Sequence, residues 1–261
     1  MKLMTFLSDF GYKSSYVAQM KGVAYNITDA TLLDITHSIT PHDIRQGAFV
    51  LKTAVESFTR GTVNVAVVDP GVGTKRRGIV VTTSSQVFVG PDNGLLIPAA
   101  RSLGDFRVYE IQNSKLMLDD VSNTFNGRDV FTPVAAHILE GVYFEDIGPR
   151  TNDYIDLDFG KPIKTIDKII GKIIYIDDFG NIITNIRQVD LINQNIKKMN
   201  IIIKDKKIEL PYFEAYGFAK KGQALSTVGS SKHFEISINQ GNAAKKYDVK
   251  TGDQIEIRLN F

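Results

Sequence analysis

Val63-Asn64-Val65-Ala66-Val67-Val68 runs directly into Asp69-Pro70-Gly71-Val72-Gly73-Thr74-Lys75-Arg76-Arg77, and this junction carries most of the information about the fold. The first stretch is almost continuously apolar, which is typical of a strand buried on both faces of a parallel sheet. The second is a charged loop with glycines, and another apolar run, Ile79-Val80-Val81, follows it. An open α/β sheet usually holds a small ligand where loops leave the carboxyl ends of its strands. We therefore expect a ligand site that includes Asp69 and Arg76.

The segments around this junction alternate in character along residues 1–150. Strand-like runs cover residues 4–7, 31–35, 63–68, 78–83, 86–89 and 106–111, and helical patterns cover residues 16–27, 43–58, 97–103 and 130–139. Ser14 or Ser15 is available as the N-cap of the first helix. Pro98 and Pro133 fall in the first turns of the last two helices, where proline is tolerated. The alternation predicts a mostly parallel sheet covered by helices.

The composition changes between residues 148 and 162, where glycine, proline and aspartate replace the apolar pattern. Such a stretch is typical of a linker. Short runs rich in isoleucine follow at residues 172–176, 182–186, 200–203, 207–210, 224–228, 234–238 and 254–259. They predict a smaller all-β domain, a barrel or a sandwich. We therefore expect an α/β domain at residues 1–150, a linker at 151–168 and a barrel-like domain at 169–261.

Length and composition limit the classes of protein and partner. At 261 residues and 43% apolar content, the chain can bury one large core or two smaller ones. A net charge of +2 without a basic stripe argues against nucleic acid as a partner. The lack of cysteine excludes disulfides, thiolate metal sites and a cysteine nucleophile.

No segment has the pattern of an export or membrane signal. The apolar run Leu3–Leu7 is shorter than the apolar region of a secretory signal. No stretch approaches the ~18 consecutive apolar residues of a spanning helix. We expect a cytoplasmic protein without a membrane partner.

Polar clusters follow several of the apolar runs. They are Ser8-Asp9-Phe10-Gly11, Asp69 to Arg77, Pro91-Asp92-Asn93-Gly94, Thr124-Phe125-Asn126-Gly127-Arg128-Asp129 and Asp177-Asp178-Phe179-Gly180-Asn181. Asp, Asn and Gly are ordinary turn residues, so each cluster alone has a structural explanation. Their repeated occurrence at strand ends favours a shared site, because loops at one sheet edge converge.

Two roles are open for the acidic residues nearest the sheet. Asp9 can accept hydrogen bonds from a ribose diol, or it can cap the helix that follows. Asp69 and Arg76 can form a structural ion pair, and in a cleft such a pair keeps the carboxylate ionised and orients a water. Arg128 and Asp129 are expected to join Asp92 in a second ionic network that fixes the loops.

The sequence lacks the motifs of several common phosphate, dinucleotide, serine-hydrolase and metal sites. The glycines of residues 71–75 do not have P-loop spacing, and neither a GxGxxG loop nor a GxSxG elbow is present. The histidines have no metal-ligand spacing, so we expect no metal site. His137 is expected in the core and His42 in a solvated loop.

The polar segments are more specific in combination than any one is alone. In order they are Ser8-Asp9-Phe10-Gly11, Val68 to Thr74 with Arg76-Arg77, Pro91-Asp92-Asn93-Gly94, Thr124-Phe125 with Gly127-Arg128-Asp129, Ile176-Asp177 with Phe179-Gly180-Asn181 and Thr184-Asn185, and Asn239-Gln240-Gly241-Asn242-Ala243-Ala244. Over nearly its whole length the chain resembles the S-adenosyl-L-methionine hydroxide adenosyltransferases, hydrolytic relatives of fluorinase and chlorinase. The resemblance implies an α/β domain, a C-terminal β-barrel and a homotrimer with active sites between the two domain types of neighbouring subunits.

The resemblance also implies a reaction and a catalytic set. Water or hydroxide attacks the ribose C5′ of S-adenosylmethionine and releases methionine and adenosine, with no cofactor. Asp69 and Arg76 match the family's aspartate and arginine, and an aspartate at 69 separates the chain from the halogenases, which carry tyrosine there. The hydrolases read TFHGRD, whereas this chain has Asn126 at the histidine position. Asparagine positions a water but takes no proton near neutral pH, so we expect slow hydrolysis.

Further contacts follow from the resemblance. Asp9 would hold the ribose hydroxyls, Asn181 the adenine edge, and Asp177 and Ser230 the methionine ends. The remaining expected substrate contacts are Phe179, Tyr212, Glu235 and Ile238. Two other functions stay open: a nucleoside-binding protein with little turnover, suggested by Asn126, and a halide adenosyltransferase, against which the negative charge of Asp69 argues.

Overall fold

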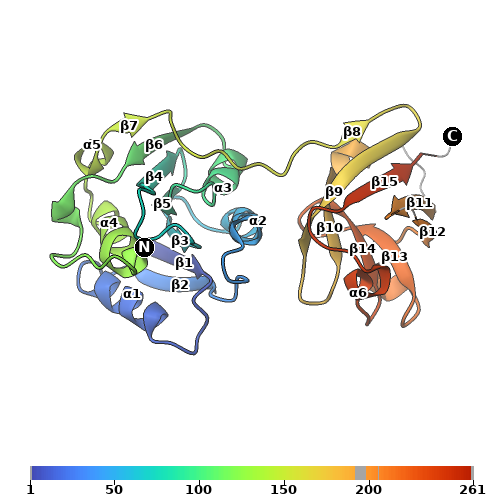
Figure 1. Cartoon of the computed structure of the whole chain (residues 1–261), viewed down its shortest axis with the longest axis horizontal. Coiled ribbons are helices and arrows are strands. Elements are labelled where there is room, and N and C mark those ends of the chain that lie inside the picture. Colours follow the sequence, from blue (N-terminus) through green and yellow to red (C-terminus); the bar gives the residue numbers. More distant parts are fainter. Residues whose placement is uncertain (1, 192–197, 205, 260–261) are drawn as a thin grey trace. The chain divides into compact units, whose positions relative to one another are not determined.

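The computed structural model describes residues 2–191, 198–204 and 206–259. The chain divides into two compact units, Met1–Asp158 and Phe159–Phe261, which Figure 1 shows in the colours of the sequence. The first unit extends beyond residue 150, because the segment after it still packs on the sheet: Arg150 and Thr151 pair with Tyr109 and Val108.

The first unit is built on one mixed sheet with the strand order β2-β1-β3-β5-β4-β6-β7. Its strands are β1 (Leu3–Ser8), β2 (Thr31–Thr36), β3 (Val63–Val67), β4 (Gly78–Thr83), β5 (Val87–Pro91), β6 (Phe106–Glu110) and β7 (Arg150–Thr151). Strands β2, β1, β3 and β5 are parallel to one another. Strands β4, β6 and β7 join as antiparallel neighbours, because the short turn between β4 and β5 leaves no room for a crossover helix.

Helices cover both faces of this sheet, with α1 and α4 on one side and α2 and α3 on the other in Figure 1. The helices are α1 (Tyr16–Tyr25), α2 (Ile44–Val55), α3 (Ile97–Ser102), α4 (Thr132–Leu139) and α5 (Phe144–Ile147), with a 3-10 turn η1 (Ser114–Leu116) and a π-helical turn η2 (Gly127–Phe131). All five residues of β3 are buried, as a strand covered on both faces requires. The α/β class is confirmed.

Two helix starts differ in how they are capped. Asp43 caps α2 by accepting a hydrogen bond from the backbone N–H of Gln46 at 2.9 Å. Ser15 occupies the N-cap position of α1, but its side chain makes no capping bond. Its Oγ instead accepts a hydrogen bond from Nε2 of Gln19 at 2.8 Å, so the expected serine cap is present in position only.

The second unit is an antiparallel sheet with the order β12-β11-β15-β9-β10-β14-β13, and β8 pairs with β9. Its elements are β8 (Ile163–Lys164), β9 (Lys168–Ile176), β10 (Ile182–Arg187), η3 (Gln188–Leu191), β11 (Lys198–Ile203), β12 (Lys206–Pro211), η4 (Tyr216–Phe218), β13 (Ala224–Val228), β14 (His233–Ile238), α6 (Ala243–Tyr247) and β15 (Gln254–Arg258). A bridge between Tyr212 and Ser226 brings the two ends of the order together. The sheet is thus curled into a nearly closed barrel around an isoleucine-rich core, and the expectation of a barrel-like all-β unit is confirmed.

Across the residues that the structure describes, no helix has both the length and the apolar character needed to cross a bilayer.

Candidate active site

A buried ion pair lies at the carboxyl end of β3. Nε and Nη2 of Arg76 donate to Oδ1 and Oδ2 of Asp69 at 3.1 and 2.6 Å. The Asp69 side chain is 5% exposed and that of Arg76 is 8% exposed. A bidentate pair of this kind fixes the plane of the carboxylate as well as its position. The structure therefore joins the two residues that the sequence placed in one loop.

The guanidinium of Arg76 is held from two further sides. Nη1 donates to the backbone carbonyl of Arg77 at 2.9 Å. The guanidinium carbon lies 5.2 Å from the ring centroid of Phe131, which is fully buried. A cation over an aromatic face is attracted by the ring quadrupole, and more strongly where water is excluded. Arg76 is thus fixed before any ligand arrives, and it in turn fixes Asp69.

The environment of Asp69 raises the pKa of its carboxyl group. Burial raises the pKa of Asp69 above its ordinary value, although the charge and hydrogen bonds of Arg76 and a backbone hydrogen bond from Gly71 oppose this. The negative charge of Asp9 adds to the increase. The Asp9 carboxylate therefore lies close enough to act on Asp69 at this end of the sheet.

Asp9 directly follows β1, but it does not cap α1, whose N-cap position is Ser15. Its Oδ2 instead accepts a hydrogen bond from the backbone N–H of His42 at 2.9 Å. The side chain is half-buried. A carboxylate held at one oxygen leaves its other oxygen as an acceptor for hydroxyl groups.

The segment that carries Asn126 packs against both neighbouring loops. The rings of Phe10 and Phe125 contact edge to face with centroids 5.7 Å apart. A Cβ added to Gly73, which has φ +76°, would lie only 2.6 Å from the carbonyl oxygen of Asn123. Asn126 is half-buried and immediately precedes the π-helical turn η2, an element that occurs frequently at functional sites. The loops of Asp9, Asp69 and Asn126 therefore converge on one edge of the sheet.

The expected second ionic network is confirmed for Arg128 and Asp129 and wrong for Asp92. Asp92 pairs with Arg77, whose Nη2 and Nε donate to Oδ2 at 2.6 and 3.1 Å. Arg128 pairs with its neighbour Asp129 at 2.5 Å. The sequence offered several acids within reach of each arginine, and only the direction of each side chain in the fold separates them.

Asp92 and Arg77 fix the segment that leaves the sheet after β7. Oδ1 of Asp92 accepts a hydrogen bond from the N–H of Ile155 at 2.9 Å. Nη2 of Arg77 donates to the carbonyl of Asp153 at 2.6 Å. Since Asp92 is 3% exposed, loss of its charge would leave Arg77 without its buried partner.

We expect Asp92→Asn to destabilise the first unit by about 2 kcal/mol, because hydrogen bonds to charged groups are each worth about 1.5–3 kcal/mol. Urea unfolding followed by circular dichroism measures the change. Asp156→Asn is the matched control, since this 56% exposed acid pairs with Arg101 at the surface and should change stability by less than about 1 kcal/mol. Equal effects of the two substitutions would contradict the assignment.

The second unit holds its own polar cluster in the turn between β9 and β10. Oδ1 of Asp177 accepts hydrogen bonds from the N–H groups of Phe179 and Asn181 at 3.0 and 2.8 Å, and Oδ2 accepts one from Nδ2 of Asn181 at 2.9 Å. Asn181 is 7% exposed, whereas the Phe179 side chain is 77% exposed. The turn thus presents an unpartnered aromatic face beside a fixed amide, which suits contact with a flat heterocycle.

A buried carboxyl on β14 belongs to the same region. Oε1 of Glu235 accepts hydrogen bonds from the hydroxyls of Tyr216 and Ser237, both at 2.6 Å. Burial raises the pKa of Glu235, and the charge of Asp177 adds to that increase. Burial also raises the pKa of Tyr216, as do its hydrogen bond to Glu235 and that negative charge. The charge of Asp177 therefore acts on both Glu235 and Tyr216 within this unit.

The remaining expected contacts have unequal surroundings. Tyr212 is partly buried at the β12–β13 closure. Ser230 is exposed in the turn between β13 and β14. Ile238 is 9% exposed and packs in the barrel core, and its backbone carbonyl accepts a hydrogen bond from the N–H of Gly241 at 3.0 Å.

The histidines differ in their surroundings. His42 is exposed, as expected, with φ +69°. His137 was expected in the core, but it is only half-buried on α4. Within the described ranges, no group of His, Asp and Glu side chains is arranged to hold a metal ion.

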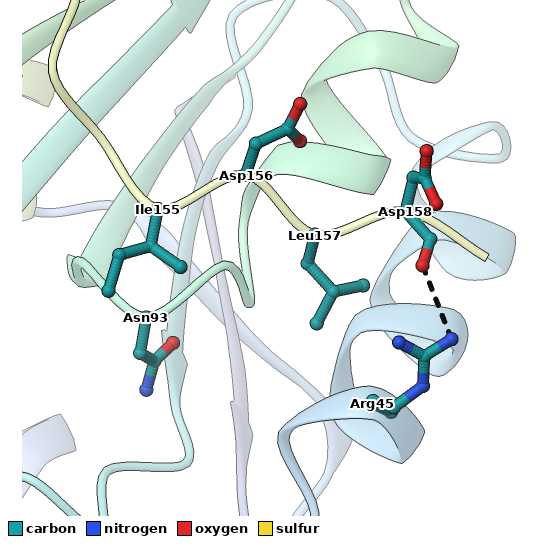
Figure 2. Close-up of a pocket in the computed structure, with 6 residues that line it drawn as sticks. All are labelled: Arg45, Asn93, Ile155, Asp156, Leu157 and Asp158. Atoms are coloured by element: carbon teal, nitrogen blue, oxygen red, sulfur yellow. Dashed lines mark hydrogen bonds between the residues drawn. The ribbon is translucent and has the colours of Figure 1, made fainter. Parts of the chain in front are cut away.

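Figure 2 shows a surface hollow of about 470 Å³ on the first unit, lined by residues 155–158 with Asn93 and Arg45. Nη2 of Arg45 donates to the carbonyl of Asp158 at 3.2 Å. Asn93 reaches it from the turn after β5, where its Nδ2 donates to the carbonyl of Val68 at 2.8 Å. Neither Asp69 nor Arg76 lines this hollow.

Sequence reasoning missed two residues that shape the candidate site. Phe131 supports Arg76, and Tyr216 donates to Glu235. Neither has a motif of its own. Phe131 comes two residues after the polar cluster that ends at Asp129, which was the available signal for it, but such residues are more often part of the core. Tyr216 follows none of the polar clusters closely.

Both units of the chain are similar to known proteins. The SAM hydroxide adenosyltransferase N-terminal domain profile matches residues 4–148, and the C-terminal domain profile matches residues 171–256. The chain is 37% identical to a protein of Methanocaldococcus jannaschii named (R)-S-adenosyl-L-methionine hydrolase, over 98% of this chain and 95% of that protein. It is 25% identical to a protein of Nocardia brasiliensis named fluorinase, over 98% and 97% of the two chains.

A solved structure has the same architecture. The crystal structure of an uncharacterized conserved protein from Thermotoga maritima superposes with a TM-score of 0.92 at 38% identity, covering 97% of this chain and 99% of that one. The profiles of both domains of one family match in order along the chain, so they identify the family as well as the fold. The chain belongs to the SAM hydroxide adenosyltransferase family.

Proposed function

We propose that this protein hydrolyses S-adenosyl-L-methionine to adenosine and L-methionine. The observation that carries the proposal is the buried, bidentate Asp69–Arg76 pair at the end of β3 in a chain of this family. The name of the Methanocaldococcus jannaschii relative supports the same reaction. The test is to incubate the pure protein with S-adenosylmethionine and to measure adenosine and methionine by chromatography, against a blank without protein.

In this reaction an oxygen of water forms a bond to C5′ of the ribose while the C5′–sulfur bond breaks. The bonding electron pair goes to sulfur, which becomes the neutral thioether of methionine, and one proton is released. Because the sulfonium is already a good leaving group, the protein supplies alignment, exclusion of water and an oriented nucleophile. Asp69 accepts a hydrogen bond from the water, Arg76 fixes Asp69, and Asp9 holds the ribose hydroxyls.

The substrate contacts in the second unit complete the proposal. Asn181 would contact the adenine edge, with the Phe179 ring against its face, and Asp177 and Ser230 would bind the ends of methionine. Tyr212, Glu235 and the backbone at Ile238 would line the same site. We further propose a cytoplasmic homotrimer without a cofactor, in which neighbouring subunits contribute the two sets of residues; light scattering tests the trimer and cell fractionation tests the location.

Asn126 is expected to limit the rate, because an amide positions water without taking its proton. We expect Asn126→His to raise kcat by roughly tenfold, since a general base typically contributes ~10²–10⁴ and Asp69 already supplies part of this. Steady-state adenosine formation at saturating substrate measures the change. His137→Gln is the control for a histidine change away from the site. An unchanged or lower kcat in Asn126→His would show that proton removal does not limit turnover.

The rate is also expected to depend on pH through Asp69. Its carboxyl is ionised above its pKa, and that pKa lies above the ordinary value. The value of kcat/KM should therefore fall with decreasing pH at a point above the ordinary carboxyl range of about 4. A pH–rate profile, with the Asp69 carboxyl followed by carbon-13 NMR, tests this. Titration of Asp69 below pH 4 would contradict it.

Two other functions give different results in the same assay. A nucleoside-binding protein, which Asn126 favours, would bind adenosine in calorimetry and form no product. A halide adenosyltransferase would form a chlorinated nucleoside only when chloride is present. The carboxylate of Asp69 repels an incoming anion, so we expect the same products with and without chloride.

A further inference from the structure

A buried Ser–His–Asp cluster lies beside β1, apart from the Asp69–Arg76 pair. Oγ of Ser8 lies 2.7 Å from Nδ1 of His37. Nε2 of His37 lies 3.1 Å from Oδ1 of Asp34. These residue types in this order form the triad of serine hydrolases. Here, however, the side chains of Ser8 and His37 are 0% exposed, so a substrate cannot reach the hydroxyl and the cluster needs another explanation.

The surroundings of His37 fix which nitrogen carries the proton. Burial lowers the pKa of His37 below its ordinary value, although Asp34 opposes this, and so favours the neutral ring. Nε2 of His37 and Oδ1 of Asp34 have no other hydrogen-bond partner within the described chain, so the Nε2 proton faces that oxygen. Oδ2 of Asp34 is held by Lys21 Nζ at 2.7 Å. Nδ1 is then an acceptor for the Ser8 hydroxyl proton.

The Ser8 hydroxyl connects His37 to the backbone after β1. Its Oγ accepts a hydrogen bond from the N–H of Phe10 at 3.2 Å. The carbonyl of His37 accepts another from the N–H of Gly11 at 2.7 Å. Asp9 lies between these two points, and the N–H of His42 holds its Oδ2. Side-chain and backbone bonds from residues 37–42 thus fix the turn that carries Asp9.

We propose that His37 is a positioning residue: through Ser8 it holds the Asp9 carboxylate in the orientation that a ribose diol requires. The proposal rests on the function proposed above, because it assigns His37 to the nucleoside part of that site. Loss of the Ser8 contact would let the turn relax and weaken nucleoside binding. The Asp69–Arg76 pair would remain in place, so the bound substrate would still react.

Two conservative substitutions separate the contacts of the ring. Asparagine places its amide near Nδ1 and can keep the bond to Ser8, whereas glutamine reaches toward Nε2 and keeps the contact with Asp34 instead. We expect His37→Gln to raise the Kd for adenosine and the KM for S-adenosylmethionine about tenfold, the equivalent of roughly one hydrogen bond. His37→Asn should stay within about threefold of wild type. kcat should change less than KM in both.

A double-mutant cycle tests the route through Ser8. Ser8→Ala should weaken adenosine binding as much as His37→Gln does, and the double variant should lose no more than either alone, because both remove one contact. His137→Gln is the matched control on α4 and should leave the Kd unchanged. Melting temperatures of all variants show whether any loss follows stability instead.

Each outcome decides between the proposals. Equal losses in His37→Asn and His37→Gln, or additive losses in the double variant, would overturn the positioning role while leaving hydrolysis intact. If the wild type binds adenosine but forms none from S-adenosylmethionine, hydrolysis is refuted, and the Kd series still decides the role of His37. If the wild type neither binds adenosine nor forms it from S-adenosylmethionine, both proposals fail.

Discussion

Replacing Asp69 with asparagine is expected to reduce adenosine formation by about 10²–10⁴-fold, the range typical of removing a group that handles a proton in the transition state. The amide is close in shape to the carboxylate, so the packing around residue 69 and the backbone change little. Its oxygen can still accept from Nε of Arg76, but its NH₂ would face Nη2, which now lies 2.6 Å from Oδ2. The substitution therefore removes the charge and disturbs the bidentate pair together.

Initial rates at saturating S-adenosylmethionine, with adenosine measured by chromatography, test this expectation. Asp248→Asn is the matched control, because this 92% exposed aspartate in the second unit has φ +54°, a conformation that asparagine tolerates well. Its rate should equal that of the wild type. An Asp69→Asn rate within about threefold of wild type would rule out the carboxylate as the group that orients the nucleophile, since even weak general bases contribute more than this.

The second large effect is expected at Gly90 on β5. A Cβ at this position would lie 2.2 Å from the carbonyl oxygen of Ala66 on β3, and this neighbour is backbone that cannot rotate away. β5 sits between β3 and β4, so it cannot shift outward without breaking a ladder on its other side. We expect Gly90→Ala to destabilise the first unit by about 3 kcal/mol, the upper end of the range for overpacking.

Urea unfolding followed by circular dichroism measures the loss, and hydrogen exchange of β3 and β5 amides assigns it to the first unit. Gly22→Ala is the control, because no atom lies within 4 Å of the added Cβ in α1, and alanine is favoured over glycine in a helix by about 1 kcal/mol. It should be neutral or stabilising. Equal stability of Gly90→Ala and wild type would mean that β3 and β5 separate more easily than their contact indicates.

Much of the fold follows from apolar patterning. The continuous run at residues 63–68 predicted a doubly covered strand, and β3 is buried along its whole length. The isoleucine-rich runs predicted strands of a small barrel because short alternating segments fit no helix. By contrast, β7 contains only Arg150 and Thr151, which is too short for any period to show.

The ion pairs of the site were harder to predict where several acidic residues could equally well pair with one arginine. Asp69 and Arg76 share one short loop, so their pairing followed from proximity. Arg77 had several acids within possible reach, and the choice of Asp92 depends on where β5 ends beside β4. The support of Arg76 by Phe131 depends on the π-helical turn, which adds one residue per turn and changes the direction of that side chain.

Two adjacent arginines in the loop between β3 and β4 pair with different carboxylates, and this limits how the loop can evolve. Arg76 pairs with Asp69, whereas Arg77 pairs with Asp92. Inserting or deleting a single residue between Asp69 and these arginines would move one of them into the place of the other and leave one of the two buried carboxylates, Asp69 or Asp92, without its partner. The length of the loop between β3 and β4 is therefore constrained. Related chains should differ here by substitutions and not by insertions or deletions.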